Sequence, residues 1–176
     1  MIKPFVITLI AVVAAGVLAQ AQTSPASAPT DPQIAMIVVT ADNVDIAAGK
    51  LAAKKTSNPK VKEFAELMVR DHTSVNNQAT ELAKKLNVTP EESPTSKSLK
   101  SDGVKTLAKL RGLSGAAFDK AYINNEVTYH EAVIKAVDNT LIPNAKTAEI
   151  KALLESGRPI FVSHLNHAKE VQTSLQ

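Results

Sequence analysis

Three of the four histidines in this sequence lie where the surrounding helical pattern calls for an apolar residue. They are His72, His130 and His164, and each falls on the apolar stripe of a different predicted helix. An imidazole in a protein core is costly unless its ring nitrogens find partners. Three such side chains meeting in one interior would form a buried polar site, either a metal centre or a hydrogen-bonded polar core.

A carboxylate accompanies the histidines. Asp45 interrupts the apolar stripe of the first predicted helix, at about the same depth as His72. Three imidazoles and a carboxylate suit a transition ion such as Zn, Cu, Ni or Fe(II). Asp71 and Asp119 flank the stripes, and we expect them to be outer partners that accept hydrogen bonds from His72 or His130.

The depth of His164 is the weak point of this interpretation. Pro143-Asn144 marks the turn before the helix that carries His164. At a rise of roughly 1.5 Å per residue, His164 lies roughly 30 Å from that turn, against about 15–20 Å for His130. His164 therefore joins the site only if a kink at Pro159 brings it to the same height. His167 lies beside the stripe, and we expect it to face solvent.

No catalytic pattern is present. Ferritin-like di-iron proteins use Glu-x-x-His pairs, whereas here Glu126 precedes His130 by four residues, which argues against oxidase or ferroxidase chemistry. The sequence has no Cys, no Gly-rich phosphate loop and no Gly-x-Ser-x-Gly motif. We therefore assign no catalytic residue and favour a protein that is not an enzyme.

Four long helices must position these side chains. The first is expected from Asp31, as the N-cap, to about Lys55, and the second follows Asn58-Pro59. The third is expected to be capped by Ser114. The fourth should be kinked or split in two at Gly157-Arg158-Pro159.

The connection between the second and third helices is long enough to cross the molecule. It is expected to be a loop from Asn87 to Ser98, which is polar and broken by Pro90 and Pro94, followed by a short helix from Leu99 to Leu110. No segment alternates with a period of two, so we expect no sheet. The sequence predicts an all-α fold, a ferritin-like four-helix bundle with a short extra helix in the crossover between helices two and three. A plain up-down order is the alternative.

The N-terminal residues have the pattern of a signal peptide. Lys3 precedes an apolar run from Phe5 to Leu18, and Ala19-Gln20-Ala21 provides a cleavage site. The run is short for a membrane span, which needs about 20 apolar residues. We predict a signal peptide over residues 1–21, a flexible Pro-, Ser- and Ala-rich lead-in over 22–30, and a bundle domain over 31–176. The protein is then exported, periplasmic or outer-membrane associated, with no membrane span after cleavage.

The composition restricts the partners. The formal charge of the chain is +3, aromatic residues make up 3 %, and no basic run is interleaved with aromatics. These features argue against nucleic-acid binding. They leave other partners and the formation of homo-oligomers open.

Four stretches together resemble the domain of unknown function 4142 family. They are Asp45–Ala52, Phe64–Thr73, Leu113–Tyr122 and Pro159–Leu165. The family comprises exported bacterial proteins that are often labelled outer-membrane or periplasmic, and the resemblance spans Asp31 to Leu175. It implies a ferritin-like bundle, and it implies no activity, because the family has none established.

Two functions are consistent with these features. The first is a non-enzymatic binding or stress-protective role in the cell envelope. The alternative is a metal-binding bundle that uses the buried histidines for metal sequestration or redox chemistry. Ring nitrogens within roughly 4–5 Å of one another would favour a metal, given ligand bonds of about 2.0–2.1 Å. Rings bonded to separate carboxylates would favour a polar core.

Overall fold

The computed structural model describes residues 28–176, and this part of the chain is helical with no strand, as the sequence predicts. The predicted signal peptide and most of the lead-in lie outside the described residues. The long helices are α1 (Asp31–Lys55), α2 (Pro59–Lys85), α4 (Gly115–Ala136) and α6 (Ala148–Ser174). A further helix, α3 (Pro94–Arg111), connects α2 to α4. A π-helical turn (Val137–Leu141) and the short α5 (Ile142–Asn144) continue α4 toward α6.

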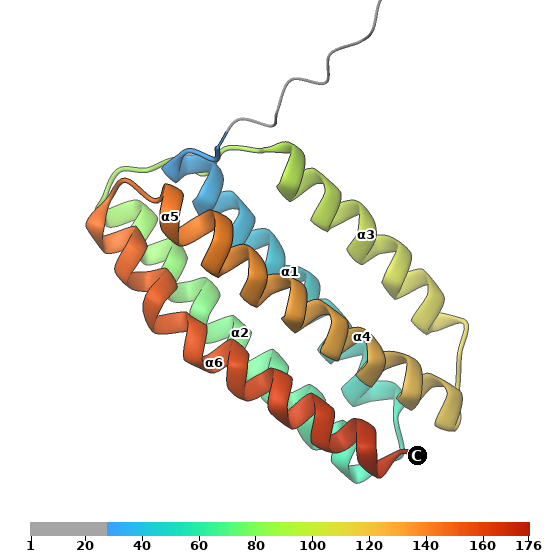
Figure 1. Ribbon diagram of the computed structural model, residues 1–176. Coiled ribbons are helices and arrows are strands. Elements are labelled where there is room, and N and C mark those ends of the chain that lie inside the picture. Colours follow the sequence, from blue (N-terminus) through green and yellow to red (C-terminus); the bar gives the residue numbers. More distant parts are fainter. Residues whose placement is uncertain (1–27) are drawn as a thin grey trace, which may run out of the picture.

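The long helices lie side by side (Figure 1). Helix α1 packs against α2, and α4 packs against α6, while α3 lies along the outside, mainly against α1. Helices α1 and α6 run in one direction and α2 and α4 in the other. This order follows because α3 carries the chain back along the molecule before α4 begins. Between residues 28 and 176 no helix combines the length and hydropathy needed to cross a bilayer.

Helix α1 begins with a capping box. Thr30 is its N-cap, and the side chains of Thr30 and Gln33 each bond the backbone N–H of the other residue. The prediction of Asp31 as the cap was therefore wrong by one residue. The Asp31 carboxylate instead accepts hydrogen bonds from the backbone N–H groups of Lys146 and Thr147, at 2.9 and 2.8 Å. It thereby ties the start of α1 to the start of α6.

Helix α3 starts five residues before the predicted Leu99. Ser93 is its N-cap and forms a capping box with Ser96, and Pro94 occupies the first turn. The prediction treated Pro94 as a helix breaker. Proline is favourable at this position, because a residue in the first turn needs no N–H partner.

Helix α6 is one helix through Pro159, so of the two predicted outcomes, a kink or a split, the split does not occur. A proline inside a helix removes one backbone hydrogen bond. Here the turns around it are held from the side, because Leu154, Gly157 and Phe161 are buried on one face. In addition, the Arg158 guanidinium donates two hydrogen bonds to Asp138, at 2.6 and 2.8 Å.

The apolar interior consists of two clusters at opposite ends of the helices. One includes Ala52, Phe64, Met68, Phe118 and Val171, and the other includes Ile34, Val75, Val137, Leu154 and Phe161. Between them every long helix contributes buried polar side chains. We call these six residues the polar belt: Asp42, Asp45, His72, Glu126, His130 and His164.

Candidate metal centre

The polar belt is assembled by helical spacing. Asp42 and Asp45 are three residues apart on α1, and Glu126 and His130 are four apart on α4, so each pair shares a helix face. His72 comes from α2 and His164 from α6. The belt therefore draws on all four long helices.

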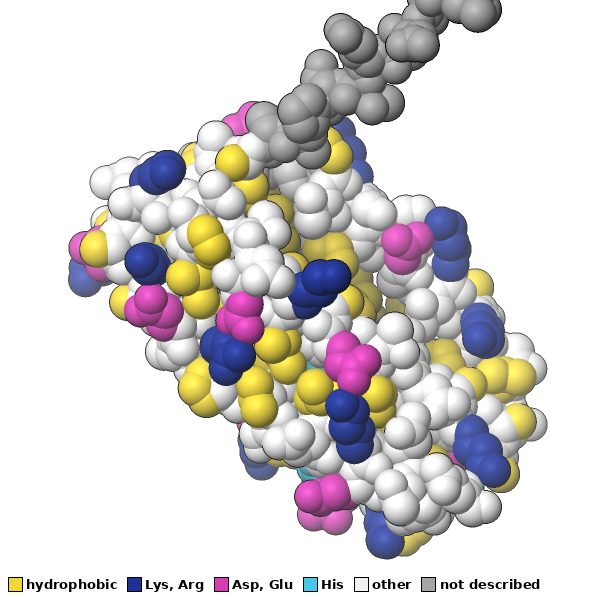
Figure 2. All heavy atoms as spheres, viewed as in Figure 1, with side chains coloured by type: hydrophobic (Ala, Val, Ile, Leu, Met, Phe, Trp, Pro, Cys, Tyr) yellow, Lys and Arg dark blue, Asp and Glu magenta, His cyan; other side chains and the backbone are white. Residues whose placement is uncertain are grey.

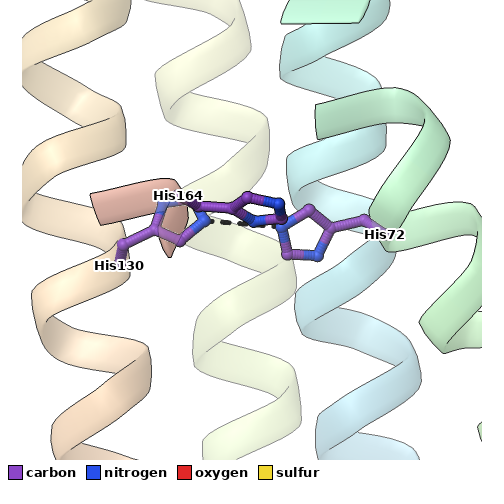
Figure 3. Close-up of side chains that lie close together, drawn as sticks. All are labelled: His72, His130 and His164. Carbon is purple, nitrogen blue, oxygen red and sulfur yellow. Dashed lines mark hydrogen bonds between the residues drawn. The ribbon is translucent and has the colours of Figure 1, made fainter. Parts of the chain in front are cut away.

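The three imidazoles meet at its centre (Figure 3). Their ring centroids are 5.6 Å apart for His72 and His130, 5.2 Å for His72 and His164, and 5.4 Å for His130 and His164. The Nε2 atoms of His72 and His130 are 3.4 Å apart. One nitrogen from each ring can be chosen so that all three lie within 4.8 Å of one another.

Asp45 places a carboxylate beside the two closest imidazoles. Its Oδ2 atom lies 3.1 Å from Nε2 of His72 and 3.6 Å from Nε2 of His130. Despite this proximity, neither Asp45 oxygen receives a hydrogen bond of ordinary geometry. The Asp45 carboxylate thus faces the histidines and can still accept hydrogen bonds or bind an ion.

Each histidine is held by one of its nitrogens. Nδ1 of His72 lies 2.8 Å from Oδ1 of Asp42, and Nδ1 of His130 lies 2.9 Å from the backbone oxygen of Glu126. Nε2 of His164 lies 3.0 Å from Oδ2 of Asp71. All three partners are acceptors, so each of these ring nitrogens is the protonated donor.

The remaining nitrogens are those that meet in the belt. His72 and His130 direct Nε2 toward each other, and Nδ1 of His164 is buried without a hydrogen-bond partner. Metal-bound histidines characteristically use one nitrogen for the ion and donate the other N–H to a carboxylate or carbonyl. His72 and His130 have this arrangement, and His164 has one nitrogen bonded to a carboxylate and the other left unpartnered.

The protonation of the rings follows from their surroundings. Burial by itself would lower the pKa of His72, but Asp45 and Asp42 outweigh it and raise the pKa to about 10. Burial lowers the pKa of His130, and it lowers the pKa of His164 to about 4 against the opposing effect of Asp71. At neutral pH without a metal, His72 is therefore the cation and the other two rings are neutral.

The buried carboxyl groups differ from one another. Burial would raise the pKa of Asp45, but the neighbouring histidines, His72 above all, lower it. Burial raises the pKa of Asp42, and burial together with the Asp45 charge raises the pKa of Glu126 well above its usual range. Asp45 is therefore the carboxyl group that ionises more readily at the centre, and Glu126 beside it resists ionisation.

The structure brings His72, His130, His164 and Asp45 together. His164 lies at the same height as the other two rings, without the large offset that the sequence predicted. That prediction placed the turn at Pro143-Asn144, whereas these residues belong to α5 and α6 begins only at Ala148. His164 is then about 16 residues from the start of its helix, or roughly 24 Å.

Asp71 and Asp119, the two expected outer partners, lie in different places. Asp71 contacts His164 rather than His72 or His130, and it is also bonded to Arg70. Asp119 is buried on α4 next to Phe118 of the first apolar cluster, and within residues 28–176 no hydrogen bond or ion pair joins it to a histidine. His167 is half-buried rather than exposed to solvent, with its ring edge-on to Phe64 at 5.2 Å.

Two members of the belt were missed by sequence reasoning. Asp42 lies outside the narrow stripe through Asp45, and Glu126 was considered only as part of a failed Glu-x-x-His pattern. A usable signal was present in both cases, because residues three or four apart on a helix share a face. Asp42 pairs in this way with Asp45, and Glu126 with His130.

Comparison with known families agrees with the resemblance noted in the sequence. The family model described as "Domain of unknown function (DUF4142)" matches residues 16–171. The chain belongs to the DUF4142 family. No curated protein and no solved structure matches the chain. For this DUF4142 protein, the function must therefore be argued from the polar belt itself.

Proposed function

We propose that this DUF4142 protein binds one transition-metal ion in the polar belt. The ligands are Nε2 of His72, Nε2 of His130, Nδ1 of His164 and the Asp45 carboxylate. One observation carries the proposal: Nε2 of His72, Nε2 of His130 and Oδ2 of Asp45 are 3.1, 3.4 and 3.6 Å from one another. Ligand atoms 2.0–2.1 Å from a tetrahedral ion lie about 3.3–3.4 Å apart.

The unsatisfied atoms of the belt support an ion over a self-contained polar core. A hydrogen-bonded core should leave few buried polar atoms without partners. Here Oδ1 of Asp45, Oε2 of Glu126 and Nδ1 of His164 have none, and Oδ2 of Asp45 has no hydrogen bond beyond its 3.1 Å ion-pair contact with His72. An ion bound by Asp45 and His164 would satisfy several of these atoms at once.

A polar core without metal is the second candidate. It is favoured by the buried ion pair between the His72 imidazolium and the Asp42 carboxylate, at 2.8 Å. That pair and an ion are compatible, because Asp42 uses Nδ1 of His72 and an ion would use Nε2. Metal binding would then displace the Nε2 proton of His72 and leave the Asp42 contact in place.

The ligand set favours storage or sequestration of the ion over catalysis. Catalytic zinc sites keep a position open for water or substrate, whereas four protein ligands close the coordination sphere. Three imidazoles and one carboxylate suit Zn, Cu or Fe(II), and they do not suit the oxygen-rich sites of Ca or Mg. We therefore assign no reaction to the site.

Sequestration also gives a concrete form to a stress-protective role in the cell envelope. The export pattern in residues 1–21 supports a periplasmic or outer-membrane location. The parallel pair α2 and α4, joined by the long connection through α3, supports a ferritin-like bundle. In this proposal, the protein binds a transition-metal ion and thereby lowers its free concentration in the cell envelope.

The test is a binding measurement on metal-free protein. Zn²⁺, Cu²⁺ and Fe²⁺ are titrated in competition with a chelator, and one ion per chain is expected. His164→Gln should weaken binding by about 100-fold, since structural zinc sites contribute about 10–16 kcal/mol over four ligands. His167→Gln, which changes the histidine outside the belt, is the matched control and should leave affinity unchanged.

Nuclear magnetic resonance of the unmodified protein supplies a test that needs no variant. An ion in the belt should shift the imidazole signals of His72, His130 and His164 and leave His167 in place. A folded protein that binds none of these ions more tightly than about 100 μM, a weak affinity of roughly 5–6 kcal/mol, would refute the proposal. Shifts confined to His167 would refute it too.

A further inference from the structure

The end of the molecule that lies at the lower right of Figure 1 carries a group of basic side chains. Helices α1, α3 and α6 end here, and α2 and α4 begin here. Nζ of Lys55 donates to the backbone oxygen of Leu110 at 3.3 Å and to that of Arg111, which joins the end of α1 to the end of α3. We call the five exposed basic residues in these turns the basic cluster: Lys54, Lys60, Lys62, Lys109 and Arg111.

The basic cluster has no carboxylate partners. Within residues 28–176, none of its five members forms an ion pair with Asp or Glu. At the opposite end the charges are paired, because Lys84 lies 2.9 Å from Glu81 and Lys97 lies 3.5 Å from Glu92. Figure 2 shows Lys and Arg side chains beside Asp and Glu over much of one face, whereas few Asp or Glu lie beside them at the lower right, where α3 ends. Positive charge therefore gathers at this end.

The helix dipole accounts for only part of the cluster. Lys54, Lys109 and Arg111 lie in the last turns of α1 and α3, where free carbonyl groups favour a cation. Lys60 and Lys62 lie in the first turn of α2, where free N–H groups disfavour a cation, and no acidic residue offsets them in that turn. These two lysines are thus unfavourable for the helix that carries them. A contact with an anion outside the chain would give them a role.

We propose that the basic cluster binds the surface of a bilayer that contains anionic phospholipid. Clusters of about four to eight Lys and Arg are attracted to such a surface, with a gain in affinity of about fivefold per residue. Because the cluster lies at one end of the helices, the bundle would stand on the bilayer rather than lie along it. Nucleic acid is the less favoured anion, since no aromatic side chain of residues 28–176 is exposed for a base to stack on.

The experiment is co-sedimentation of the protein, expressed from the full-length sequence, with lipid vesicles. One set of vesicles is phosphatidylcholine with about one third phosphatidylglycerol, and the other is phosphatidylcholine alone. Binding to the anionic vesicles should be tighter by at least about 30-fold, the contribution of two basic residues at the surface. Raising the salt from about 0.1 M to 1 M shortens the Debye length from about 10 Å to 3 Å and should remove most of that difference.

Two double variants with the same change in net charge make the test specific. Lys54→Gln with Lys109→Gln removes two members of the cluster and should weaken binding to anionic vesicles by about 10–30-fold. Lys85→Gln with Lys151→Gln removes two exposed lysines at the opposite end, well beyond a Debye length of about 10 Å, and should change binding by less than about twofold. Neither pair belongs to the polar belt, so the result does not depend on metal binding.

Magnetic resonance of the unmodified protein locates the contact without any variant. Anionic vesicles with a spin label on the lipid headgroup should enhance the relaxation of amides in residues 54–62 and 109–112 more than elsewhere. Enhancement centred on another surface would overturn the proposal, as would equal binding to the two kinds of vesicle or an equal effect of the two double variants. Tighter binding to DNA or to polyphosphate than to the vesicles, at the same salt, would assign the cluster to a soluble polyanion and overturn it too.

Discussion

Replacing Asp42 by asparagine tests whether this carboxylate holds His72. Both side chains are buried, and Oδ1 of Asp42 lies 2.8 Å from Nδ1 of His72. The substitution keeps the size and one acceptor but removes the charge. A hydrogen bond to a charged group contributes about 1.5–3 kcal/mol, against about 0.5–1.5 kcal/mol for a neutral pair. The metal-free variant should therefore lose about 1–2 kcal/mol of unfolding free energy.

Three measurements test the hold of Asp42 on His72. For a chain of this size, 1–2 kcal/mol corresponds to a fall in Tm of about 2–8 °C. The pKa of His72, raised to about 10 partly by Asp42, should fall in an imidazole titration followed by magnetic resonance. Because Asp42 is an outer partner of a proposed ligand, zinc affinity measured against a chelator should drop about 10–100-fold.

Asp102→Asn is the matched control. Asp102 is exposed on α3 and bonded to Lys105 at 2.9 Å, a surface pair whose attraction is screened by solvent. The reasoning is refuted if Asp42→Asn behaves like this control, with Tm, the pKa of His72 and zinc affinity all unchanged. Asp42 would then have no hold on His72.

Three further perturbations test other parts of the structure. Because burial lowers the pKa of His164 to about 4, the unfolded chain binds a proton below pH 6.5 that the folded chain does not. Metal-free stability should fall by about 3 kcal/mol from pH 6.5 to 4, and chemical denaturation of His164→Gln should show a flatter profile. Gly103→Ala puts a methyl group 2.7 Å from Cγ2 of Val44 on α1 and should lower the free energy of unfolding, measured by thermal denaturation, by about 1–3 kcal/mol. Gly112→Ala, whose methyl group meets no atom nearer than 3.5 Å, should leave it unchanged. Asp31→Ala removes the carboxylate that accepts hydrogen bonds from the backbone of Lys146 and Thr147 and should cost about 1–2 kcal/mol in the same assay, and an unchanged Tm would contradict that role.

The helices that sequence reasoning placed best are those with a clear cap and a regular apolar stripe. The ends of α1 and α2 match the prediction closely, because Asn58 and the prolines of the first turns mark the starts and the stripe continues to the last turn. The start of α3 was missed because a proline disrupts a helix in its interior but is favourable in its first turn. For Pro94, only the capping bond between Ser93 and Ser96 decides which applies.

The candidate site was predicted in outline but not in its depth or its outer partners. The positions of His72, His130 and Asp45 on the apolar stripes of their helices could be predicted from helical spacing alone. The height of His164 could not, because it depends on where α6 begins, and the π-helical turn and α5 delay that start to Ala148. The pairing of Asp71 with His164 depends on which faces of α2 and α6 meet, and the residue spacing within either helix does not specify that.

The polar belt also limits how the helices can slide past one another. The apolar stripes repeat, and small side chains such as Ala48, Ala52 and Ala65 would tolerate packing one turn higher or lower. A slip of one turn, about 5.4 Å, would carry an imidazole or a carboxylate into an apolar cluster. Each buried polar group left without a partner costs about 1–3 kcal/mol, so a slip that strands several would offset much of the stability of a domain. The side chains at mid-height thus select one alignment of the four long helices among several that hydrophobic packing alone would allow.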